Sequence, residues 1–131
     1  MQIWRYLLAA TAVLFLVAVV VQVFLAGLGL SGLGGSGMAT HIDFGYTISL
    51  APVVPLILTW PARAGRTTAI LCAALLVDAF VQTLLPLARD DVPFVAALHP
   101  VNALLLFGLS VIVARRAIAL ARVSASPASQ A

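Results

Sequence analysis

Long runs of apolar residues separated by short polar stretches dominate the chain. Four such runs cover residues of about 4–30, 37–60, 67–87 and 92–114. A helix that crosses a hydrocarbon core about 30 Å thick needs roughly 20 predominantly apolar residues. Each run is long enough, so the pattern predicts four membrane spans. We expect one membrane domain over 1–123, followed by a flexible tail over 124–131.

The polar stretches between the runs contain residues that end helices. The first connector, 31–37, is rich in glycine, Trp60-Pro61 closes the second run, and Arg89-Asp90-Asp91 follows the third. The first run is longer than the roughly 7–15 apolar residues of a signal peptide. We therefore expect it to be retained as a span, which gives an all-α transmembrane four-helix bundle.

Composition supports lipid as the solvent of this chain. Of 131 residues, 63% are hydrophobic and only 8% are charged, a balance that excludes a soluble globular domain of this length. The seven basic residues are all arginines, and they flank the apolar runs instead of forming a solvated patch. Nucleic acid is therefore not an expected partner, whereas the lipid bilayer is.

The arginines also predict an orientation. Arg89 lies on one side of a four-span bundle, and all the others lie on the opposite side: Arg5, Arg63, Arg66, Arg115, Arg116 and Arg122. Cytoplasmic connectors carry an excess of arginine and lysine. Both termini are therefore expected in the cytoplasm, and the starts of the second and fourth spans are expected near the outer face.

The two halves of the chain resemble each other. Val21-Gln22-Val23-Phe24-Leu25 in the first half corresponds to Val81-Gln82-Thr83-Leu84-Leu85 in the second, at an offset of 60 residues. His41 and His99 follow at an offset of 58. The similarity predicts two tandem helical hairpins related by an axis along the membrane normal. Chance similarity between apolar hairpins is the alternative.

His41 and His99 are the only histidines, and the topology brings both to the outer half of the bundle. Two imidazoles on facing helices can occupy both axial positions of a haem iron, with the bundle supplying an apolar slot. A b-type haem with both positions taken by histidines has none open for a substrate, so we expect electron transfer, with a redox partner or quinone, or haem sensing. No catalytic residues are indicated. Whether the protein is an enzyme is left open by these residues.

Several neighbours of the histidines fit this hypothesis. Gly45 and Ala103 stand four residues after His41 and His99, one turn deeper on the same faces, where a flat macrocycle needs clearance. Asn102 or Asp43 could fix the tautomer of a ring, and Arg89 could meet a haem propionate. The expected cofactor-binding residues are His41, His99, Gly45, Ala103, Asn102 and Arg89, with the two histidines as the metal ligands.

Other interpretations of the histidines remain open. Both rings could simply reach towards the headgroups or cap the starts of helices, in an accessory or scaffold protein with structural histidines and no cofactor. Zinc bound by the two histidines and Asp43 is a further alternative, without a clear supporting shell of residues. A transporter is disfavoured because four spans enclose little space unless the protein forms a homo-oligomer.

Three polar side chains fall inside the predicted spans. Asp78 lies near the middle of the third span, with Gln82 one turn along, and Gln22 is the repeat counterpart of Gln82. These intramembrane residues could form a proton path or a polar wall for a cofactor or quinone, or they could be hydrogen-bonding glue between helices.

The motifs carry a family resemblance over nearly the whole chain. The stretch Gln22–Gly27, His41 with Gly45-Tyr46, and His99-Pro100-Val101-Asn102-Ala103 resemble a family of small four-span bacterial membrane proteins of unknown function. This implies a multi-pass protein of the bacterial cytoplasmic (inner) membrane. The layout is also similar to one half of haem A synthase, which implies that His41 and His99 are axial ligands. The chain lacks the second half and the acidic catalytic motif of that enzyme, so the synthase reaction is not implied.

Overall fold

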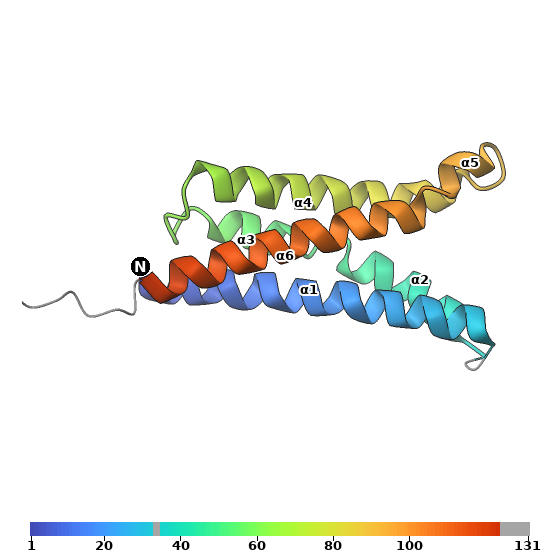
Figure 1. The fold of residues 1–131 in the computed structure, drawn as a ribbon, viewed down its shortest axis with the longest axis horizontal. Helices are drawn as coiled ribbons and strands as arrows, with labels where there is room; N and C mark the ends of the chain where they lie inside the picture. Colours follow the sequence, from blue (N-terminus) through green and yellow to red (C-terminus); the bar gives the residue numbers. More distant parts are fainter. Residues whose placement is uncertain (33–34, 124–131) are drawn as a thin grey trace, which may run out of the picture.

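The computed structural model describes residues 1–32 and 35–123, and the predicted tail 124–131 lies outside this part (Figure 1). The chain is all-α, as predicted. Its helices are α1 (Gln2–Ser31), α2 (Gly37–Ile48), α3 (Val53–Leu58), α4 (Arg66–Leu84), the 3₁₀ turn η1 (Leu85–Ala88), α5 (Pro93–Ala96) and α6 (His99–Val123).

Four stretches of this bundle are long and apolar enough to cross a membrane. They are Gln2–Ser31, Gly37–Leu58, Arg66–Ala88 and Pro93–Val123. Large apolar side chains such as Leu30, Leu104 and Ile57 are exposed on the outside of the bundle. A helix that presents apolar residues all round is typical of a membrane span, so the prediction of four spans is confirmed by length and hydropathy.

The core is a seam of small and branched side chains along α1, α4 and α6. On α1 the buried residues Leu8, Ala12, Phe15 and Val19 recur every three or four positions and form one stripe. The helix α1 packs against α6, and Figure 1 shows the two helices close together at the N-terminus of α1 and diverging towards α2 and α5. Residues on the other two helices complete the core: Cys72, Leu75, Ala79, Leu106, Val113, Ala114 and Ala117. Alanine in this seam lets the helix backbones approach closely.

The second span is built from two helices instead of one. Pro52 has no backbone N–H, and a proline ring clashes with the carbonyl four residues earlier, which here belongs to Ile48, the last residue of α2. Tighter turns bridge the gap, with hydrogen bonds of 3.0 Å from Ala51 N to Ile48 O and from Val53 N to Leu50 O. α2 packs on α1, whereas α3 packs on both α1 and α4.

The fourth span starts at Pro93, close to the expected position 92, but it consists of two helices and extends further at its C-terminal end. Two residues separate the short helix α5 from α6, so His99 is the first residue of α6. At the other end the helix continues through Arg115 and Arg116 to Val123, beyond the expected end near residue 114. Arginine is a good helix former, so these charges limit the apolar stretch without ending the helix.

Close packing at one glycine pair sets α2 against α1. A Cβ atom on Gly37 would lie 2.8 Å from the backbone nitrogen of Gly29, and one on Gly29 would lie 2.8 Å from that of Met38. The two backbones can therefore approach this closely only because both positions are glycine. The contact brings the following turn of α2, which carries His41, beside Gln22 of α1.

Candidate functional site: a pocket with paired histidines

The structure brings His41 and His99 together. The centroids of the two imidazole rings lie 6.2 Å apart, and the ring planes are nearly perpendicular at 86°. His41 comes from the second turn of α2 and His99 from the first residue of α6. We refer to this end of the bundle, which also contains the connector with Asp90 and Asp91, as the histidine end.

Each histidine is held by a glutamine of the preceding span, through the same two contacts in both halves. The side-chain nitrogen of Gln22 donates to the backbone oxygen of His41 at 2.7 Å, and His41 Nδ1 lies 3.0 Å from the backbone oxygen of Gln22. In the second half, the Gln82 amide donates to His99 O at 3.1 Å, and His99 Nδ1 lies 3.0 Å from Gln82 O. The sequence similarity between the hairpins therefore corresponds to the same local geometry.

These contacts select one tautomer of each neutral ring. A carbonyl oxygen only accepts hydrogen bonds, so Nδ1 must carry the proton in both histidines. Nε2 then presents a lone pair, which is the arrangement that metal-binding histidines use when a backbone carbonyl orients them. The side-chain nitrogen of Gln82 lies 3.4 Å from Nε2 of His99, so this ring has an additional polar neighbour.

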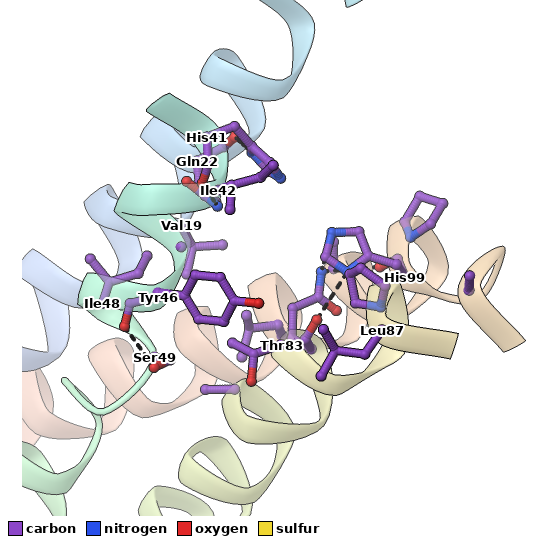
Figure 2. Close-up of a pocket in the computed structure, with 18 of the residues that line it drawn as sticks. Val19, Gln22, His41, Ile42, Tyr46, Ile48, Ser49, Thr83, Leu87 and His99 are labelled. Atoms are coloured by element: carbon purple, nitrogen blue, oxygen red, sulfur yellow. Dashed lines mark hydrogen bonds between the residues drawn. The ribbon is translucent and has the colours of Figure 1, made fainter. Parts of the chain in front are cut away.

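The rings face a pocket of about 450 Å³ between α2 and the adjoining ends of α4 and α6. Apolar residues from several helices form most of its wall: Phe15, Val19, Met38, Ile42, Ile48, Ala79, Pro86, Leu87, Ala96 and Leu106. Figure 2 shows Tyr46 projecting from α2 across the pocket towards Thr83 of α4. The pocket therefore combines an apolar interior with a few polar groups, as small-molecule sites do.

Gly45, Ala103 and Arg89 also line this pocket. The clearance at Gly45 has a definite use, because a Cβ atom there would lie 2.5 Å from Nε2 of Gln22. Glycine thus lets the Gln22 amide pass the helix and reach His41 O. From the sequence, a small residue at this position indicates clearance for a macrocycle or close packing of helices.

A polar chain behind His99 has no counterpart behind His41. Asn102 donates to the side-chain oxygen of Gln82 at 2.8 Å and also interacts with the buried carboxyl of Asp78. Phe44 occupies the corresponding position three residues after His41. Among the residues that the structure describes, the buried side-chain oxygen of Gln22 accordingly has no hydrogen-bond partner, and neither has one buried carboxyl oxygen of Asp78.

Asp43, the candidate third ligand for zinc, lies outside the pocket. Asp43 is exposed and does not line the pocket. In residues 1–32 and 35–123, no group of three or more histidine, cysteine, aspartate or glutamate side chains is placed to hold a metal ion. A metal ion held by His41 and His99 would therefore take its other ligands from groups other than these side chains.

Two features of the site were missed from the sequence. The direct pairing of Gln22 and Gln82 with the histidines is signalled by their similar separations, 19 and 17 residues. Tyr46 was noted only as part of a motif, although its ring lines the pocket. Its position next to Gly45, in the turn after His41, was the available signal.

Comparison with known proteins adds no relative. The chain matches no protein-family model, no curated protein and no solved structure. The two resemblances drawn from the motifs therefore stay expectations. Length, hydropathy and fold together identify the chain as a small multi-pass membrane protein with four candidate spans.

Proposed function

We propose that the protein binds one haem b between His41 and His99 and acts as a membrane-embedded electron carrier. The observation that carries this proposal is the paired geometry of the rings, 6.2 Å between centroids with both Nδ1 atoms engaged by backbone carbonyls. A neutral imidazole protonated at Nδ1 is a good ligand for haem iron through Nε2. At His99 the iron would replace the 3.4 Å contact between Nε2 and the Gln82 side-chain nitrogen.

The ring separation suits two ligands of one metal ion. An imidazole nitrogen binds a metal at about 2 Å, so the centroids of two imidazoles on opposite sides of one iron lie roughly 6 Å apart. The observed 6.2 Å agrees with this spacing.

The pocket offers the other features that a haem needs. Its volume of about 450 Å³ falls within the range of roughly 300–1,000 Å³ for small-molecule sites, and its wall is mostly apolar. Arg89 lines the pocket from the connector side, where its guanidinium can pair with a carboxylate. Among the residues of this site, His41 and His99 would hold the iron and Arg89 would hold a propionate.

Ligation by two histidines directs the chemistry. A haem held by His41 and His99 would supply a one-electron couple, with no position left for oxygen or substrate. The protein's own residues orient the ligands and exclude water through the apolar wall. We therefore propose exchange of electrons with a redox partner or a membrane quinone, in the cytoplasmic membrane of a bacterium, with both termini in the cytoplasm.

Haem content tests the proposal directly. Protein expressed in haem-replete cells and purified in mild detergent should be coloured, with a Soret band, a sharp α-band on reduction and about one haem per chain. Colourless protein that also fails to take up added haem would contradict the proposal.

A structural role for the histidines is the second candidate, and a specific observation favours it. Both histidines already form interhelical hydrogen bonds through Nδ1 and backbone oxygen, which would connect α1 to α2 and α4 to α6 without any cofactor. Such bonds contribute on average about 0.6 kcal/mol each in membrane proteins. In that case the protein would be an accessory or scaffold subunit, and removal of a histidine would change stability without any spectral effect.

A further inference from the structure

The end of the bundle opposite the histidines concentrates positive charge. We call it the arginine end and define it by three contacts: Gln2 Nε2 to Ala121 O at 3.4 Å, Arg5 Nε to Ala62 O at 3.1 Å, and Arg116 Nε to Thr68 Oγ1 at 3.5 Å. All arginines except Arg89 lie in the segments joined there: Arg5, Arg63, Arg66, Arg115, Arg116 and Arg122.

Within residues 1–32 and 35–123, no acidic side chain lies at this end. The four acidic residues lie elsewhere: Asp43 in α2, Asp78 beyond the middle of α4, and Asp90 and Asp91 in the connector at the histidine end. Five of the arginines at this end, all but Arg5, have exposed side chains. The arginine end is therefore a surface that attracts anions.

Arg63 stands at a position where glycine would be the unstrained choice. Its φ angle is 49°, the only positive value at a non-glycine residue in residues 1–32 and 35–123. Hydrogen bonds from Arg63 N to Trp60 O at 2.9 Å and from Ala64 N to Thr59 O at 3.0 Å close the end of α3 in the pattern of a Schellman cap. Such caps usually place glycine at this position because a Cβ atom is unfavourable there.

Strain at a surface arginine suggests that the side chain serves a purpose other than stability. The surroundings of Arg63 indicate which one. Arg63 shares a shallow cleft with Met1, Trp4, Trp60 and Pro61, and the Trp60 side chain is 87% exposed. Tryptophan at the end of a span is typical of the membrane interface, at the level of the lipid headgroups.

We propose that Arg63, with Trp4 and Trp60 beside it, binds the phosphate group of an anionic phospholipid in the leaflet that surrounds the arginine end. The guanidinium pairs with phosphate oxygens, and the indoles lie against the glycerol and upper acyl region. Lipid is the occupant because the cleft adjoins the ends of two apolar spans, α1 and the α2–α3 span, where headgroup phosphates are the nearest anions. This site is independent of the haem proposal.

Lipid titration of the purified full chain tests the site. Thermal unfolding is followed in detergent while phosphatidylglycerol is added, with phosphatidylcholine of the same acyl chains and inorganic phosphate as comparisons. A ligand of the folded state raises the unfolding temperature with a half-saturation set by its affinity. Wild type should respond to phosphatidylglycerol at lower concentration than to phosphatidylcholine and should not respond to inorganic phosphate.

Two variants separate binding from folding. R63G removes both the charge and the backbone strain, so without lipid it should unfold at the same or a higher temperature than wild type. Its half-saturation by phosphatidylglycerol should rise about fivefold, the factor that corresponds to the roughly 1 kcal/mol contributed by one basic residue at an anionic surface. R63K keeps charge and strain and should show a half-saturation within about twofold of wild type.

Three results would overturn the proposal. One is an unchanged phosphatidylglycerol response in R63G, and another is equal stabilisation of wild type by phosphatidylcholine. The third is stabilisation by inorganic phosphate at the same concentration, which would indicate a general anion site and not a lipid site.

Discussion

The hydrogen bond from Asn102 to Gln82 should contribute measurably to stability, because its counterpart in the first half is missing. Asn102 Nδ2 donates to Gln82 Oε1 at 2.8 Å, whereas Gln22 Oε1 is buried without a donor and Phe44 replaces the asparagine. The two halves therefore provide a matched pair of sites, one with the bond and one without it.

The perturbation is Asn102→Leu, which leaves Gln82 Oε1 in the situation of Gln22 Oε1. A buried acceptor that loses its partner costs about 1–3 kcal/mol, while hydrogen bonds between membrane helices average about 0.6 kcal/mol in double-mutant cycles. Asn102 also interacts with Asp78, so we expect the single substitution to lower the free energy of unfolding by about 1–2 kcal/mol.

A double-mutant cycle isolates the bond. Asn102→Leu, Gln82→Leu and the double variant are unfolded reversibly in mixed micelles, and the coupling energy is expected at about 0.6–1 kcal/mol. The control cycle uses Phe44→Leu and Gln22→Leu, where no such bond exists and coupling should stay within about 0.3 kcal/mol of zero. Equal coupling in the two cycles, or none in either, would refute the asymmetry between the halves.

Three further predictions concern orientation and packing. Six arginines lie at the arginine end, which predicts a cytoplasmic location for it and for both termini. A phosphatase fused after Ala131 should therefore be inactive, and one inserted at Gly35, on the outer side, should be active. Reversed activities would invert the topology. Asp78→Asn should give a normal yield of folded protein and Asp78→Lys almost none, since an ammonium at this buried depth has no anionic partner. Equal yields of the two variants would place Asp78 in contact with water. Gly45→Ala should displace the Gln22 amide and lower the free energy of unfolding in detergent by about 1–3 kcal/mol. The control Gly27→Ala, with open space around the position, should raise it by about 0.5–1 kcal/mol. A change of the same sign in both variants would contradict the packing at Gly45.

The length of the four apolar runs decides the fold of this chain, and so the sequence predicts most of the fold. Four runs separated by glycine, proline and arginine leave little alternative to four helical spans, because unpaired backbone groups are not tolerated in lipid. Backbone detail inside a span is harder to predict. Pro52 could have kinked one continuous helix, whereas the structure interrupts the span between Ile48 and Val53.

The site was predictable in its main residues and not in their bonding. His41 and His99 stand out because they are the only histidines and follow similar motifs. Each ring forms a hydrogen bond from Nδ1 to the backbone oxygen of a glutamine. This bond depends on the exact relative position of two helices, which residue spacing in the sequence does not give. The same holds for Gly45, because only the approach of α1 to α2 shows that its clearance is used by Gln22.

The absorption spectrum of the purified protein beside His41→Ala and His99→Ala tests the central claim most directly. We predict a six-coordinate low-spin haem spectrum for wild type, and for each variant either loss of haem or a five-coordinate high-spin spectrum, since one axial bond is removed. An unaltered low-spin spectrum in either variant would show that the substituted histidine is not a ligand, and a colourless wild type from haem-replete cells would contradict the account as a whole.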